Sequence, residues 1–339
     1  MTNYRYAYCT EAELLADLGL NGFIDSILDR FIDPATQYIL QEIGQFIPTS
    51  EKRVFAGNNK TVLYVDPILS VTSILNGDTP LISTDYMLEP ANGMWQNGPY
   101  TRLNVDLDES RAGVWIPEVD GVEINGLWGL YNRMVDTEAV VGTTQLVTDN
   151  TLTVNDGSLV CPGMVLSIEG ECQMVTRRKS AAVATTLLLD AGVSDDVLYV
   201  VSSTGLNVGE IIKIGYEIIK IVDKQTGSLQ VIRGWGGSPK STHALSMNVE
   251  VYRTFTVERA VNGTAAAGHV NNTAISRYVA PSDVNYLCRQ IAALMLMKSR
   301  TGYAGRAGSP ETGETFYNHE FPRDVIARIK ANYFIPGTR

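Results

Sequence analysis

Residues 208–222 read VGEIIKIGYEIIKIV, and this stretch decides the fold of the central part of the chain. Two isoleucine-rich runs flank Gly215, which predicts two β-strands joined by a tight turn. A further β-rich run at 198–201 precedes this hairpin, and another at 229–232 leads into a loop that begins at Arg233. The middle of the chain is therefore expected to contain a small all-β unit.

The same pattern occurs a second time, split into halves at 152–175 and 255–278 that lie on either side of the first copy. In both copies an arginine is followed ten residues later by a histidine and nine residues after that by a tyrosine. These residues are Arg233, His243 and Tyr252 in the continuous copy and Arg259, His269 and Tyr278 in the split copy. Because the ends of a hairpin loop are already adjacent, we expect a β-unit with a copy of itself inserted in such a loop, and equivalent places for the paired arginines and histidines.

The two ends of the chain have a helical pattern. Thr10 followed by Glu13 is a capping box, and two further apolar stripes predict short helices up to about residue 43. Strands with turn signals follow as far as 124, and helices return at 282–298 and 322–333. We therefore expect an α+β fold in which residues 1–134 and 279–339 form a discontinuous core, a small helical bundle with β-hairpins. Residues 135–278 would be an inserted all-β domain of two nested repeat units, the second at 178–253.

The composition is that of an ordinary folded protein, with 45% hydrophobic and 19% charged residues. The chain starts without the apolar stretch of a signal peptide and contains no run of about twenty apolar residues. We therefore expect no membrane association and a location in a cytoplasm, or in a particle assembled there. Cys161 and Cys172 are close enough in a predicted hairpin to pair, but a reducing compartment favours free thiols for all four cysteines.

The net charge of −10 is spread unevenly along the chain. Residues 1–134 carry 18 acidic and 8 basic residues, whereas 279–339 carry 5 acidic and 8 basic residues. A general nucleic-acid-binding protein has a basic face, which this composition does not favour. The acidic surface is compatible with simple solubility.

The residues do not form a pattern typical of catalysis. His243 and His269 occupy the same place in the repeat, which favours a role in the fold over a role in chemistry. The segment GGSPKST at 236–242 lacks the glycine that precedes the lysine of a phosphate loop, and no helix follows it. The acidic residues of 106–109 alternate along a predicted strand, as on a solvated strand face. We therefore expect a protein that is not an enzyme, with no cofactor and no metal.

The outer parts of the chain resemble the head–tail connector, or adaptor, family of long-tailed bacteriophages. The resemblance rests on the helical start at 10–46, on TVLYVDPI at 61–68, YMLEP at 86–90, GPYTRL at 98–103 and VEINGLWG at 122–129, and on the helix at 281–298. Proteins of this kind keep the last two pieces nearly adjacent, whereas here about 145 residues separate Arg133 from Val279. The departure from the family pattern is thus a large β-rich insertion.

This resemblance implies a structural virion protein of the phage neck. It would form a homo-oligomeric ring, expected to be dodecameric, that docks on the portal protein of the head and binds the next neck or tail protein below. DNA would pass through the lumen without specific binding. The ring would be assembled in the cytoplasm of the bacterial host.

The C-terminal arm is the candidate partner-binding site. It follows a glycine-rich stretch at 302–313 and combines basic with aromatic residues, which is typical of an arm that becomes ordered on a partner. The candidate residues are Arg323, Arg328, Tyr333, Phe334, Ile335 and Arg339. A helix that packs on its own subunit is the alternative interpretation of the same pattern.

Two other functions remain open at this stage. The β insertion is compatible with a module that binds carbohydrate or another feature of the host surface, and exposure of Trp128 and Trp235 in a shallow groove would favour it. A tail-completion or baseplate protein would keep the structural class but occupy another place in the tail.

Overall fold

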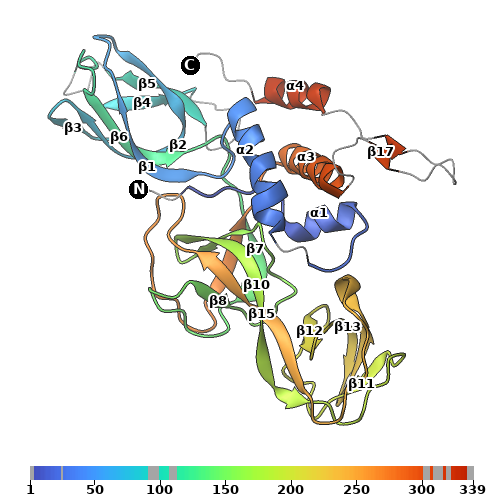
Figure 1. Ribbon diagram of the computed structural model, residues 1–339. Coiled ribbons are helices and arrows are strands. Elements are labelled where there is room, and N and C mark those ends of the chain that lie inside the picture. Colours follow the sequence, from blue (N-terminus) through green and yellow to red (C-terminus); the bar gives the residue numbers. More distant parts are fainter. Residues whose placement is uncertain are drawn as a thin grey trace.

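The computed structural model describes residues 4–23, 26–90, 99–106, 113–300, 306–307, 316–317 and 322–333. The fold is mostly β, with two large antiparallel sheets of six and ten strands, 40% strand and only 19% helix (Figure 1). The prediction of an α+β fold built on a small helical bundle with β-hairpins was therefore wrong. Residues 49–128 form one continuous sheet with its own core instead of hairpins that lean on helices.

The first sheet has the strand order β1-β6-β2-β5-β4, with β3 paired to β2. Its strands are β1 (Thr49–Phe55), β2 (Val62–Asn76), β3 (Thr79–Leu81), β4 (Tyr86–Glu89), β5 (Tyr100–Val105) and β6 (Val122–Trp128). Trp115 and Trp128 are fully buried in the core of this sheet, and their indole N–H groups donate to the carbonyls of Thr61 and Glu51, each at 2.9 Å. Both rings are buried and both indole N–H groups are hydrogen-bonded, so the two tryptophans stabilise the core of this sheet.

The helices come from both ends of the chain. They are α1 (Glu11–Asp17), the π-helix η1 (Leu28–Ile32), α2 (Asp33–Glu42), α3 (Ser282–Arg300) and α4 (Arg323–Asn332). The predicted capping box begins α1: the Thr10 N–H donates to Glu13 Oε2 at 2.9 Å and the Glu13 N–H donates to Thr10 Oγ1 at 3.3 Å. Within the described residues, no helix combines the length and the apolar character that crossing a membrane requires.

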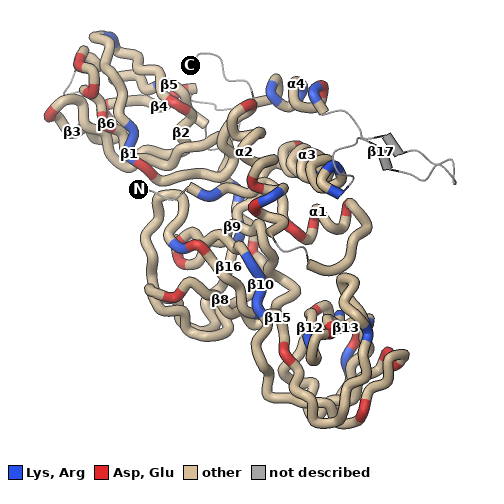
Figure 2. Tube along the Cα trace, in the orientation of Figure 1, with Lys and Arg blue, Asp and Glu red and all other residues tan. Residues whose placement is uncertain are grey.

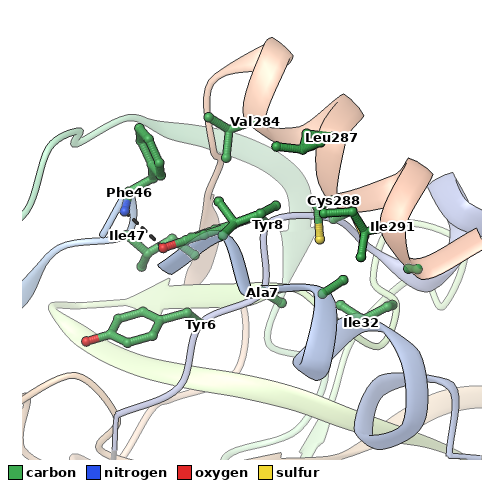
Figure 3. Packing of buried hydrophobic residues seen from close by; sticks show 14 of the residues in the cluster. Tyr6, Ala7, Tyr8, Ile32, Phe46, Ile47, Val284, Leu287, Cys288 and Ile291 are labelled. Atoms are coloured by element: carbon green, nitrogen blue, oxygen red, sulfur yellow. Dashed lines mark hydrogen bonds between the residues drawn. The ribbon is translucent and has the colours of Figure 1, made fainter. Parts of the chain in front are cut away.

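These helices share a core with the N-terminal segment and with the second sheet (Figure 3). Tyr8 lies beside Cys288 and Ile291 of α3, and its hydroxyl accepts a hydrogen bond from the Phe46 N–H at 3.1 Å. The second sheet completes the same core with Val165, Cys172 and Met174 from its strands and with Val261 from the loop after β15. Because β-residues close it, this core is not an independent helical bundle.

The second sheet has the order β11-β14-β13-β12-β15-β10-β9-β16-β7, with β8 paired to β15. Its strands are β7 (Met134–Val140), β8 (Thr151–Thr153), β9 (Val165–Ile168), β10 (Glu171–Thr186), β11 (Val197–Tyr199), β12 (Ile211–Ile214), β13 (Glu217–Gln225), β14 (Ser228–Ile232), β15 (Asn248–Glu258) and β16 (Ala274–Tyr278). The two-residue strands β17 (Arg306–Ala307) and β18 (Phe316–Tyr317) pair with each other elsewhere.

The long strands β10 and β15 pair with each other along their length and connect two separate hydrophobic cores (Figure 1). We call the part around the first core, built from 135–177 and 254–278, the outer unit. The part around the second core, built from 178–253, is the nested unit. The predicted equivalence of the two copies of the repeat is visible in two isolated β-bridges. Gln145 pairs with His269 in the outer unit, and Ala191 pairs with His243 at the corresponding place of the nested unit.

The two ends of the β insertion lie side by side. Met134, the first residue of β7, pairs with Tyr278, the last residue of β16. Immediately beyond them, the Val279 N–H donates to the Arg133 carbonyl at 3.0 Å. The chain thus leaves the helical part and returns to it through two adjacent strands.

Candidate functional site

The outer unit contains a buried cluster of Glu171, Arg259 and His269. Nε and Nη2 of Arg259 donate to the two carboxylate oxygens of Glu171 at 2.6 and 2.7 Å. Nε2 of His269 lies 2.8 Å from Glu171 Oε2. The backbone N–H groups of Ala260 and Ala267 donate to the same carboxylate at 3.2 and 3.1 Å. One strand and the loop after β15 are therefore fixed to a single glutamate.

The nested unit repeats this cluster bond for bond around Glu217. Nε and Nη2 of Arg233 donate to its two oxygens, each at 2.7 Å, and Nε2 of His243 lies 2.8 Å from Oε2. The N–H groups of Gly234 and Ser241 donate to the carboxylate at 2.9 and 3.1 Å. The predicted equivalence of Arg233 with Arg259 and of His243 with His269 is thereby confirmed.

The remaining N–H groups of each arginine bind backbone carbonyls of neighbouring loops. The acceptors are Leu146, Asp149 and Ala267 for Arg259, and Gly192, Asp195 and Ser241 for Arg233. Each guanidinium therefore connects a glutamate to two loops. Bidentate arginine–carboxylate pairs of this kind combine strong hydrogen bonds with a fixed geometry.

The electrostatics of the two glutamates are set by opposing effects. Burial alone would raise the pKa of Glu217, but hydrogen bonds from Arg233, from the Ser241 N–H and from His243 lower that pKa to about 2. For Glu171, burial is likewise outweighed by Arg259, the Ala267 N–H and His269, which lower its pKa to about 2. Both carboxylates therefore stay ionised inside the protein.

These clusters are suited to holding loops in place. Each carboxylate oxygen accepts at least two hydrogen bonds, and each arginine uses its N–H groups on protein acceptors. The role in the fold predicted for His243 and His269 is confirmed. The glutamates were missed as cluster members, although Glu171 and Glu217 both begin the strand after the turn in their copies.

A third buried glutamate joins the two units. Arg253 donates to both oxygens of Glu210 through Nε at 2.5 Å and Nη2 at 2.6 Å, and the Gly157 N–H donates to Oε1 at 2.9 Å. Glu210 belongs to the nested unit and Gly157 to the outer unit. This bond set therefore links the two units to each other.

The nested unit also contacts the helical part directly. The rings of Phe23 and Tyr252 meet edge to face at 5.0 Å, and the guanidinium of Arg178 lies 5.0 Å from the Phe23 ring. Gly22 and Gly236 approach so closely that a Cβ on Gly22 would lie 2.2 Å from the Gly236 Cα. Only two glycines fit this crossing, so the nested unit is packed against the N-terminal segment.

The structure does not bring the candidate residues of the C-terminal arm together. Arg323 and Arg328 are exposed on α4, whereas Tyr333 is buried, donates to Asp283 Oδ1 at 2.9 Å and packs 4.8 Å from the Phe46 ring. Ile326 and Ile329 belong to the same core. Over 322–333 the arm therefore packs on its own chain, which agrees with the alternative interpretation of a helix that packs on its own subunit. The other three candidates, Phe334, Ile335 and Arg339, lie outside the described residues.

The two tryptophans considered for carbohydrate binding do not share a groove. Trp128 is fully buried at the end of β6. Trp235 lies in the short 3₁₀-helix η2 (Trp235–Gly237) of the nested unit, with the Lys220 Nζ 4.7 Å from its ring. A surface formed by this pair is therefore ruled out by geometry.

The cysteines are buried free thiols, including Cys161 and Cys172, and burial raises the pKa of both. Within the part of the chain that the structure describes, His, Cys, Asp and Glu side chains form no group of three or more suited to a metal ion. Lys and Arg are interspersed with Asp and Glu along the trace (Figure 2).

No family model, curated protein or solved structure matches the chain.

Proposed function

We propose that the protein is a structural component of a tailed-phage neck, a ring-forming adaptor between the portal of the head and the tail. The observation that supports the proposal most is the adjacency of Met134 and Tyr278. Segments on both sides of the insertion, which resemble the connector family when read together, meet in space and contribute helices to one core. An insertion into such a protein is expected to leave its two ends adjacent.

The buried polar groups of the insertion also fit a structural role. Glu171 and Glu217 have their oxygens occupied by protein donors, and Glu210 links the two units to each other. A subunit of a ring that transmits contacts between head and tail needs parts that keep their relative orientation. Saturated buried networks provide such rigidity.

The charge of the chain fits a passage for DNA that is not bound. Every contact between a cationic side chain and a phosphate adds salt-dependent affinity, which would hold the genome in the channel. Residues 1–134 carry an excess of acidic residues. An acidic wall contributed by this region would let the duplex slide.

The partners of the ring would be the portal protein and the next neck or tail protein. Arg323 and Arg328 are exposed on α4 and available for pairing with acidic groups of a partner. Phe334, Ile335 and Arg339 follow directly after this helix in the sequence and remain proposed as anchors and pairing charge. Complementary charge would fix the register of docking, and apolar anchors would supply most of the affinity.

Imaging of the purified full-length chain and of the particle tests this proposal. We expect a closed ring by negative-stain electron microscopy and a label on the chain at the head–tail junction. Arg323→Glu with Arg328→Glu should weaken binding to the portal, whereas the control pair Lys179→Glu and Lys240→Glu should not. A chain that remains monomeric and is missing from particles would contradict the proposal. A label at the far end of the tail would replace the neck by a baseplate position.

A further inference from the structure

The nested unit carries a groove on the solvent-exposed face of strands β11, β14 and β13. Its volume is about 280 Å³. The strand pairing places two rows of three side chains across this face: Tyr199, Ser228 and Gln225 form one row, and Val197, Gln230 and Asp223 form the other. The face is therefore defined by register and does not depend on loop conformation.

The outer unit provides an internal comparison for this face, because its three corresponding strands pair in the same register. Thr153 pairs with Thr254 where Tyr199 pairs with Ser228. The two threonine hydroxyls lie 3.1 Å apart across the strands. Since the fold forms with threonine at this position, packing of the β-unit does not require the aromatic ring of Tyr199.

The second row of side chains also differs between the nested unit and the outer unit. Thr151 pairs with Thr256 in the outer unit, where Val197 pairs with Gln230 in the nested unit. On the third strand, the outer unit has Arg177 and Lys179 opposite Thr256 and Thr254. The nested unit has Asp223 and Gln225 at these places. A basic, hydroxyl-rich face has thus become an acidic and amide-rich face with an aromatic ring.

The equivalence of the third strands is supported by a shared contact. Lys224 Nζ donates to the Leu206 carbonyl at 2.5 Å, and at the corresponding place Arg178 Nη1 donates to the Val160 carbonyl at 3.2 Å. The cationic side chains of both copies are therefore bound to a backbone carbonyl of their own unit. Lys224 also lines the groove, so Asp223 and Lys224 are the two charged residues of its lining, with the Lys224 ammonium bound to the Leu206 carbonyl.

The chemistry of the groove selects its ligand. Tyr199 is 48% exposed and offers a flat apolar face, while Gln225 and Gln230 are exposed amides without a side-chain hydrogen bond to the described residues. Amides donate and accept, and a carboxylate accepts. A sugar ring presents a C–H face to an aromatic ring and hydroxyl groups to amides and a carboxylate. We propose that this groove binds a neutral carbohydrate.

The size and the charge of the groove limit which carbohydrates it can bind. At about 280 Å³ the groove lies just below the range of about 300–1,000 Å³ that is usual for small-molecule pockets, so it suits a small ligand of one or two sugar rings. With one carboxylate and one ammonium group the lining has no net charge, which suits a neutral ligand better than an acidic sugar or nucleic acid. A single shallow site of this size binds its ligand weakly, and the affinity rises wherever several copies of the chain engage one polysaccharide surface.

The position of the groove is suited to such contact. Figure 1 places β11 at the end of the molecule farthest from the six-stranded sheet. The inference goes beyond the adaptor function and does not depend on it, because the groove lies wholly within the nested unit. Failure of one proposal therefore leaves the other standing.

The test uses the full-length chain on an array of neutral and acidic glycans, followed by titration of the bound sugars. Tyr199→Thr and Gln230→Thr introduce the residues of the outer unit, so these variants should fold like the parent chain by circular dichroism. We expect binding of neutral glycans and a loss of about tenfold or more in affinity for each variant. Thr153→Ala on the outer unit is the matched control and should bind as the parent chain does.

Two results would overturn the inference. One is an array on which no neutral glycan binds, and the other is an unchanged affinity in Tyr199→Thr. If that variant also assembles into a smaller oligomer, the face is a contact between protein subunits.

Discussion

Glu171 and Glu217 occupy the same position in two copies of one β-unit, and each is held by a forked arginine from the second half of its copy. The donors to the two carboxylates correspond one to one. The two copies therefore share one buried ionic cluster, while their exposed faces differ. The two copies serve as controls for each other in the experiments that follow.

Glu217→Gln should destabilise the nested unit by about 3–5 kcal/mol, because Arg233 would remain buried without a counter-charge. Glu171→Gln should cost a similar amount through Arg259. Glu118→Gln, on an exposed side chain, should change the free energy of unfolding by less than about 0.5 kcal/mol. Urea denaturation measures all three, and hydrogen exchange should locate the loss of protection of Glu217→Gln in 178–253. Equal stability of Glu217→Gln and Glu118→Gln would refute the role of the cluster.

The pH dependence of stability follows from the same carboxylates. The folded-state pKa of each is lowered to about 2 from an ordinary value near 4.5, so their contribution is present above about pH 4.5 and is lost as the pH falls toward 2. Each contributes on the order of 3 kcal/mol. Denaturation at pH 7, 5, 4 and 3 should show this loss, and each single variant, Glu171→Gln or Glu217→Gln, should show about half of it.

Asp33 should produce the opposite slope at higher pH. Burial raises its pKa to about 6, despite Arg5 at 2.9 Å, and the nearby Asp29 adds to the rise. Because the folded state then holds a proton that the unfolded state releases, stability should increase as the pH falls from about 7 to 5. Asp33→Asn should remove this increase in the same denaturation series. An unchanged profile would show that the carboxyl is already neutralised by its arginine.

Excision should distinguish the two units. The outer unit contributes Val165, Cys172, Met174 and Val261 to the helical core, so replacing 137–277 by a Gly/Ser linker should expose that core. Replacing only 180–253 by Asn-Gly should be tolerated, since Lys179 and Thr254 face each other in register and this dipeptide forms a two-residue hairpin turn. Circular dichroism and thermal unfolding compare the products. A folded, cooperative product from the larger deletion would contradict the shared core.

Removal of the C-terminal arm should lower the thermal stability of the chain. Truncation after residue 313 removes Ile326, Ile329 and Tyr333 from the core, and large-to-small changes at such sites cost about 2–5 kcal/mol each. We expect the truncated chain to melt at a much lower temperature than the Arg323→Glu, Arg328→Glu variant, whose changes are exposed. Differential scanning fluorimetry compares the two. A truncated chain as stable as the parent would place the arm outside the core.

Lysine labelling in intact particles should report where the insertion lies. A channel that passes duplex DNA has no room for a ring of inserts, so the nested unit should project outward. Lys240 is exposed, whereas Lys213 pairs with Glu250 at 3.4 Å and Lys220 lies over Trp235. Lys240 should therefore react fastest by mass spectrometry. Its full protection in particles, with ready reaction in the free chain, would indicate a buried position.

The sequence predicted those features that depend on local pattern. The capping box at Thr10 and Glu13 sets the start of α1, and the constant spacing from arginine to histidine identified the repeat before any contact was known. Glu171 was missed because a glutamate that begins a strand usually lies on the solvent face. The burial of Glu171 becomes visible only in the structure, where Arg259 lies against its carboxylate.

The six-stranded sheet could not be assembled from the sequence. Most of its strands were predicted, although β2 was read as two runs and β3 was missed. The pairing was not predictable, because β1 pairs with β6 so that Thr49 faces Trp128, and no local signal specifies such distant partners. The helices were placed correctly, yet residues such as Met174 from a distant strand complete their core. Periodicity shows which face is apolar and does not show what covers it.

The ribbon of β10 and β15 has a mechanical consequence. A domain on a single linker swivels, whereas the nested unit is reached by two antiparallel chains that are hydrogen-bonded from Met174–Glu258 to Thr186–Asn248. A force applied at the far end would be shared by both chains and resisted by many hydrogen bonds at once. The three register shifts along the ribbon set its bend. The nested unit therefore behaves as a stiff lever, and a pull on its tip would become torque on the helical core.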